Sequence, residues 1–163
     1  AGGWRDFHRA LQQHDSRHHP DAGVIVKLAL YKGRGQIGNA LIRWWCKSPY
    51  SHCEIVIGDV GYTSSLMDGG VRAKRIKFDP AHWDFVDLAW AHEHEVKMLY
   101  GQTKDEPYGW MDLIKRQFFN RPGDDRGWFC SEWCAAALGL PNPQLYSPAT
   151  LGDYCKSRLS DAR

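Results

Sequence analysis

A cysteine and a histidine, the two residue types that together perform thiol-based nucleophilic catalysis, hold favourable positions in this 163-residue sequence. Cys130 opens an Ala-rich stretch, residues 130–138, whose pattern predicts a helix. A cysteine at a helix N-terminus lies near the positive end of the helix dipole, which favours the nucleophilic thiolate. Cys134, one turn further along, is expected to be packed and inert, and such packing is the alternative role for Cys130 as well.

The candidate base and its orienting group lie on one predicted strand, residues 51–58. Side chains alternate along a strand, so His52 and Glu54 share a face while Cys53 points to the other. Nucleophilic catalysis by cysteine needs a base within reach and a third group that orients this base. The sequence therefore predicts a site made by Cys130, His52 and Glu54, although a half-buried histidine bonded to a neighbour is the plainer alternative for His52.

Elements that could position these residues follow from the hydrophobic pattern. β-rich segments separated by Gly-containing turns come first and helical segments follow, which predicts an α+β fold with an antiparallel meander sheet and helices packed on one side. Residues 1–21 predict a polar arm or helix, and residues 22–163 a single domain. The expected strands are 24–31, 51–58, 62–65, 70–74 and 85–90, and the expected helices are 37–47, 92–100, 107–120, 130–138 and 147–158.

Composition excludes several classes of protein. A net charge of +2 and 43% hydrophobic residues are typical of a folded chain and do not indicate a dedicated nucleic-acid binder or a disordered protein. No apolar stretch is long enough for a transmembrane helix. Five scattered cysteines favour free thiols over a disulfide framework.

Three other motifs have simpler interpretations. Residues 33–38 fit G-x-G-x-x-G, with Asp59 about 20 residues on, but the following strands do not alternate with helices, so no nucleotide cofactor is expected. His92, His94 and the Cys130–Cys134 pair lack the partners of a zinc site, so no metal is expected. The basic stretch 72–77 alternates along a strand, which favours a solvated face.

Several short motifs, in this order, resemble the permuted branch of the NlpC/P60 papain-like superfamily, the branch of the YiiX-like and lecithin–retinol acyltransferase-like proteins. They span about residues 24–154 and are residues 42–45, 50–58, 62–65, 68–72, 108–114 and 129–133. The resemblance implies a permuted papain-like fold over residues 22–163, with Cys130 as nucleophile and His52 as base. A polar residue on the following strand often supplies the third catalytic group in this superfamily, so Ser64 or Ser65 competes with Glu54.

The substrate side of the expected site is less specific. The Cys130 backbone N–H at the helix start would bind the oxyanion, and Tyr50 would line the cleft or polarise the substrate carbonyl. The residues expected to bind substrate or oxyanion are Tyr50, Ser51, Ser64, Trp128 and Ser131.

The resemblance implies a cysteine peptidase or amidase that cleaves peptides of bacterial peptidoglycan. A lipid-directed acyltransferase or thioesterase with the same residues is the alternative, and a non-catalytic binding module is the third. A phage structural protein or an immunity protein is a possible partner. The N-terminus lacks a secretory signal pattern, so we expect synthesis in the cytoplasm and action at the wall or periplasm after phage delivery or secretion.

Overall fold

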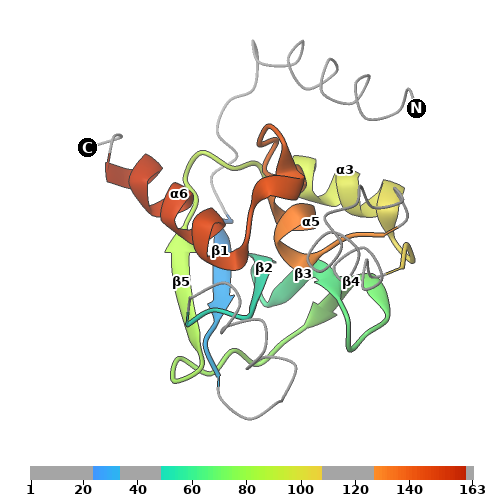
Figure 1. The fold of residues 1–163 in the computed structure, drawn as a ribbon, viewed down its shortest axis with the longest axis horizontal. Coiled ribbons are helices and arrows are strands. Elements are labelled where there is room, and N and C mark those ends of the chain that lie inside the picture. Colours follow the sequence, from blue (N-terminus) through green and yellow to red (C-terminus); the bar gives the residue numbers. More distant parts are fainter. Residues whose placement is uncertain (1–23, 34–48, 108–126, 161–163) are drawn as a thin grey trace, which may run out of the picture.

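The computed structural model describes residues 24–33, 49–107 and 127–160, and it contains one antiparallel sheet covered by helices (Figure 1). The strands are β1 (Val26–Tyr31), β2 (His52–Ile57), β3 (Val60–Ser65), β4 (Gly70–Arg75) and β5 (Trp83–Asp87). Their order in the sheet is β4-β3-β2-β1-β5. The α+β class and the antiparallel sheet predicted from the sequence are thus confirmed.

Strands β1 to β4 form the expected meander, but β5 departs from it. The chain leaves β4 at one edge of the sheet and returns to the opposite edge, where β5 pairs with β1. This pairing joins Lys27 to Asp87 and Tyr31 to Trp83, so β5 lies earlier in the sequence than the expected 85–90. The predicted strand end was wrong because Ala91 donates its backbone N–H to the carbonyl of Leu88, which turns the chain.

The described helices are α3 (Glu93–Thr103), α5 (Cys130–Ala137) and α6 (Pro148–Ser160), with a 3-10 turn, η1 (Pro143–Leu145), before α6. The bounds of the three α-helices lie within three residues of the predicted ones. The predicted arm over 1–21 and the predicted helix over 37–47 lie outside the described residues. So does the predicted helix over 107–120, apart from Pro107, which forms an isolated antiparallel bridge with Gly70.

One face of the sheet and the described helices enclose the hydrophobic core. Helix α5 packs on β2 and β3, α3 packs on β4 and α5, and α6 packs on β1 and β5. Alternate strand residues supply the sheet side of this core, as the period of two requires. The central residues are Leu28, Leu30, Cys53, Ile55, Val96, Leu99, Trp133, Cys134 and Leu151, all 2% exposed or less.

A glycine cap ends helix α5 after Ala137. Gly139 adopts a positive φ of 67°. The N–H of Gly139 donates to the Ala136 carbonyl, and the N–H of Leu140 donates to the Ala135 carbonyl. This pair of bonds is a Schellman motif, in which glycine avoids the strain that a Cβ would cause in the left-handed region.

The Trp133 side chain anchors α5 in the core and gives a test of this packing. It is fully buried, and its indole N–H donates to Thr103 Oγ1 at 2.9 Å. Replacing Trp133 with Ala should lower the free energy of unfolding by about 3–5 kcal/mol, because the cavity cannot close completely. Chemical denaturation measures this change, and Leu145→Ala, at a side chain 75% exposed, is the control that should stay within about 0.5 kcal/mol. A small loss for both variants would contradict the packing.

Candidate active site

Cys130 is the first residue of α5, and two serine hydroxyls fix the chain around it. Phe129 before it is extended, and Ser131 after it donates from Oγ to the Tyr146 carbonyl at 2.7 Å. Ser64 of β3 donates from Oγ to the Trp128 carbonyl at 2.7 Å. The backbone N–H of Cys130 is among the first N–H groups of the helix, which have no acceptor within the helix itself. The positive end of the helix dipole therefore lies at the Cys130 side chain.

Cys130, which is buried, and His52, whose side chain is 21% exposed, form a hydrogen-bonded pair. A hydrogen bond from Cys53 and a second from His52 lower the pKa of Cys130 well below its ordinary value, although burial opposes this shift. Burial also opposes charge on His52, but its bonds to Cys130 and Glu54 outweigh this and raise its pKa to about 10. The two shifts favour a thiolate–imidazolium pair at neutral pH. This is the ionisation state that a cysteine nucleophile needs.

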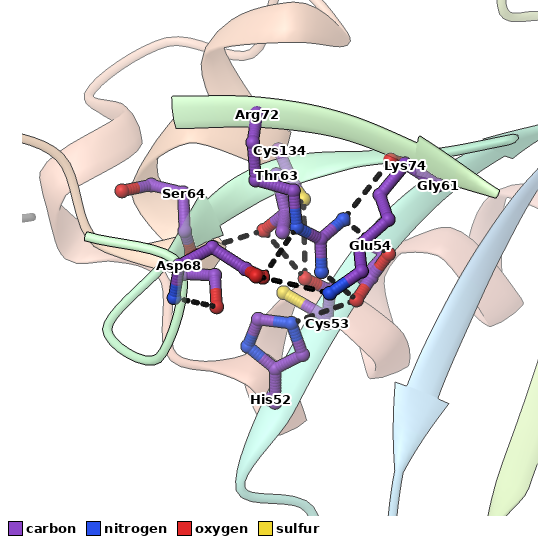
Figure 2. A network of polar contacts seen from close by, with 11 residues as sticks. His52, Cys53, Glu54, Gly61, Thr63, Ser64, Asp68, Arg72, Lys74 and Cys134 are labelled. Carbon is purple, nitrogen blue, oxygen red and sulfur yellow. Dashed lines mark hydrogen bonds and ion pairs between the residues drawn. The ribbon is translucent and has the colours of Figure 1, made fainter. Parts of the chain in front are cut away.

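The Glu54 carboxylate occupies the position of an orienting third group. Its Oε1 lies 3.0 Å from His52 Nε2 (Figure 2). Glu54 is only 1% exposed, yet its pKa is lowered. Burial would raise this pKa, and the hydrogen bonds from His52 and Arg72 reverse the effect. The structure therefore brings Cys130, His52 and Glu54 together.

Arg72 of β4 holds the Glu54 carboxylate from the other side with two parallel bonds. Its Nη1 donates to Oε2 at 2.9 Å and its Nη2 to Oε1 at 2.7 Å, the bidentate geometry that a planar guanidinium offers (Figure 2). Arg72 Nε donates to Asp68 Oδ2 at 2.9 Å, and Lys74 contacts the other Asp68 oxygen at 3.0 Å. An ionic chain thus runs from the β3–β4 hairpin through Arg72 to the histidine.

Gly61 provides the space that this carboxylate occupies. A Cβ added to Gly61 would lie 2.0 Å from Glu54 Oε2, far inside contact distance. The backbone carbonyl of Gly61 also accepts a bond from Arg72 Nη1 at 3.0 Å. A glycine at this position in β3 is therefore required for Glu54 and Arg72 to meet.

Sequence reasoning missed Arg72, Cys53 and Gly61 as parts of the site. The prediction that stretch 72–77 forms a solvated face was wrong for Arg72, whose side chain is 16% exposed, because it turns inward to Glu54. It holds for Lys74 and Arg75, which are exposed. Alternation along β4 predicts that Arg72 and Lys74 share one face of the sheet. Only the pairing register of β2, β3 and β4 shows that Glu54 lies on this same face.

The other expected site residues have varied surroundings. Tyr50 donates from its hydroxyl to Asp84 Oδ2 at 2.7 Å, and burial with that bond raises its pKa to about 12. Ser51 is buried, and its Oγ has no hydrogen-bond partner among the described residues. Trp128 donates from its indole to Glu106 at 2.5 Å. Ser65 accepts a bond from the Asp68 N–H at 3.3 Å and thereby supports the hairpin.

The hydrogen bonds of Glu54, Ser64 and Ser65 distinguish these three candidates for the third catalytic residue. The Ser64 hydroxyl is committed to the Trp128 carbonyl, and the Ser65 hydroxyl to the hairpin backbone. Among the described residues, Glu54 is the one of the three candidates that is hydrogen-bonded to the His52 ring. Cys134 is fully buried, and its Sγ lies 3.7 Å from the Cys53 carbonyl, which fits the expected packed position.

The described residues offer neither a metal site nor a membrane-spanning helix. Within the described ranges no three His, Cys, Asp or Glu side chains gather in a way that could hold a metal ion, and no helix is long and apolar enough to cross a membrane. The G-x-G-x-x-G alternative is excluded by topology, since β1 and β2 are antiparallel neighbours and a dinucleotide unit needs parallel strands. Comparison of the chain with protein-family models, curated proteins and solved structures found no match in any of the three.

The ionisation of Cys130 can be measured directly. A thiolate absorbs in the ultraviolet, and the part of this absorbance that is absent in Cys130→Ala belongs to Cys130. Because the pKa of Cys130 is lowered, this absorbance should persist well below a pH of about 8.5, the ordinary titration midpoint of a cysteine. His52→Ala should move the midpoint upward, because the imidazolium partner is gone. The exposed His82→Ala is the matched control and should leave it unchanged. A wild-type midpoint in the ordinary range would contradict the ion pair.

Removal of Arg72 tests how the buried Glu54 carboxylate is stabilised. Arg72→Met should lower the free energy of unfolding by about 3 kcal/mol near neutral pH, because a buried carboxylate loses one of its two cationic partners. The folded-state pKa of Glu54 is lowered, so its ionic contribution is present above the unfolded pKa of about 4.3 and is lost as pH falls through the folded value. The difference between Arg72→Met and wild type should therefore shrink in acid.

Denaturant unfolding at several pH values measures this effect. Arg75→Met is the matched control on the same strand, since Arg75 is 82% exposed and pairs with Asp59 at 3.3 Å on the surface. Its cost should stay within about 1 kcal/mol at every pH. Equal costs for the two variants, or a cost for Arg72→Met that does not change with pH, would show that Glu54 is not held as described.

Proposed function

We propose that this protein is a cysteine hydrolase that cleaves amide bonds, with Cys130 as nucleophile, His52 as acid and base, and Glu54 as the residue that orients His52. The observation that carries the proposal is the Cys130 side chain at the start of α5, bonded to a histidine that is itself bonded to a buried carboxylate at 3.0 Å. This arrangement provides a nucleophile, a base and an orienting group in hydrogen-bonded sequence.

The reaction proceeds in two steps. The Cys130 thiolate attacks the carbonyl carbon, and the oxyanion is stabilised by the Cys130 backbone N–H at the helix start. The imidazolium of His52 then gives its proton to the amide nitrogen, so the C–N bond breaks, an amine leaves and a thioester remains. His52 next takes a proton from water, whose oxygen attacks the thioester and releases the acid and the thiolate. Glu54 holds the His52 ring in one orientation throughout, and its charge stabilises the ring whenever it is protonated.

The substrate class proposed is the peptide of bacterial peptidoglycan, and its support is the resemblance of the motifs around Cys130 and His52 to the permuted NlpC/P60 superfamily. The fold proposed with it is the permuted papain-like arrangement. An antiparallel sheet that carries the base on a strand and the cysteine on a helix N-terminus is compatible with that arrangement. A phage lytic enzyme and a secreted interbacterial effector both fit such an activity.

The test is the release of soluble fragments from purified peptidoglycan, detected by mass spectrometry. We expect release by wild type and at least a thousandfold slower release by Cys130→Ala and by His52→Ala, on the order of the loss when a catalytic nucleophile or base is removed. Cys134→Ala, the same substitution one helical turn further on, is the matched control and should retain activity.

Glu54→Gln should reduce the rate less than Cys130→Ala does, because the amide can still accept a bond but no longer stabilises the imidazolium. Undiminished release by Cys130→Ala would overturn the proposal. Release of no fragments by wild type, together with turnover of acyl lipids or thioesters that depends on Cys130, would transfer the same chemistry to the alternative substrates.

A further inference from the structure

The register of the sheet places three rings in one row across β2, β1 and β5. Tyr31 pairs with His52 on one side and with Trp83 on the other. The core residues of β1 are Val26, Leu28 and Leu30, so Tyr31 and its neighbour Trp83 lie on the opposite face of the sheet from the described helices, whereas the His52 ring at the start of β2 also reaches Cys130 of α5. The proposed base therefore lies at one end of an aromatic row.

Ring contacts extend this row into a continuous surface. The rings of His52 and Trp83 meet edge to face at 6.3 Å, and those of Tyr31 and Trp83 lie 4.9 Å apart. Phe78 packs edge to face on Trp83 at 5.0 Å and on Phe85 at 5.6 Å. We define Tyr31, Phe78, Trp83 and Phe85 as the aromatic surface.

This aromatic surface is accessible, which core packing does not explain. Phe85 is 40% exposed, and the other three residues are partly exposed. None of the four belongs to the core cluster that the helices cover. Partly exposed aromatic rings beside a reactive group are typical of a ligand surface.

We infer that the aromatic surface binds a saccharide ring of the peptidoglycan strand, next to the peptide bond that Cys130 attacks. The inference rests on the proposed function and deepens it by naming the part of the substrate that adjoins the cleaved peptide. The C–H face of a saccharide is apolar and slightly positive, and it complements the negative face of an aromatic ring. Contact between Trp83 and His52 places this saccharide beside the reacting groups.

The charges at the rim favour a neutral ligand over an anionic membrane. On the same face, Lys27 and Asp87 pair at 3.4 Å, and beside it His82 Nδ1 lies 3.2 Å from Asp79. The exposed Lys77 precedes Phe78, but recognition of anionic lipid generally uses clusters of about four to eight basic residues. A paired rim around exposed rings therefore fits the neutral, hydroxyl-rich surface of a saccharide.

The test compares two substrates that differ only in the sugar: a disaccharide-peptide fragment of peptidoglycan and the same peptide without the disaccharide. The variants are Phe85→Ala and Phe78→Ala, neither of which has a described contact with His52. We expect KM for the disaccharide-peptide to rise roughly tenfold, with kcat and all constants for the free peptide unchanged. Met67→Ala, at a side chain 77% exposed on the β3–β4 hairpin, is the matched control.

An equal loss on both substrates, or no loss on either, would overturn the aromatic surface as a saccharide site. Calorimetric binding of the free disaccharide to Cys130→Ala, and its loss in Cys130→Ala combined with Phe85→Ala, is a readout independent of turnover. If neither substrate is cleaved but this binding is found, the proposed reaction fails and the saccharide site stands. Absence of disaccharide binding, or binding of acyl chains instead, rejects the saccharide site.

Discussion

The buried carboxylate of Glu54 is the constraint on which the rest of the site depends. A carboxylate removed from water is stable only when cations and hydrogen bonds compensate its charge, and here His52 and Arg72 approach it from two sides. Arg72 comes from β4 and His52 from β2, so the pairing of β2, β3 and β4 must be complete before the charge can be buried. Gly61 on the intervening strand leaves the necessary space. The strand register that forms the sheet is therefore also the register that the site needs.

Local patterns predicted most of the described fold. Alternation and turn glycines located β1 to β4, and helix signals located α5, because these elements depend on nearby residues. The position of β5 depends instead on its pairing with β1 across the sheet, an interaction between distant residues. Its edge position and its shifted bounds could not be predicted from the pattern of its own residues.

The candidate site was predictable to a similar extent. Cys130, His52 and Glu54 stand out because a helix start and a strand alternation are local features, and the structure brings these three residues together. Arg72 lay hidden in a basic stretch because its role depends on which strand faces Glu54. The aromatic surface was hidden for the same reason, since Trp83 and Tyr31 become neighbours of His52 only through the order β2-β1-β5.

Detection of a covalent intermediate on Cys130 tests the central claim most directly. Wild-type protein would be mixed with a peptidoglycan peptide, quenched with acid during turnover, and measured as intact protein and as proteolytic fragments by mass spectrometry. The account predicts an adduct with the mass of the acyl part of the substrate, attached at Cys130 and absent when His52 is replaced by Ala. Turnover accompanied by an acyl adduct on a different residue would contradict it.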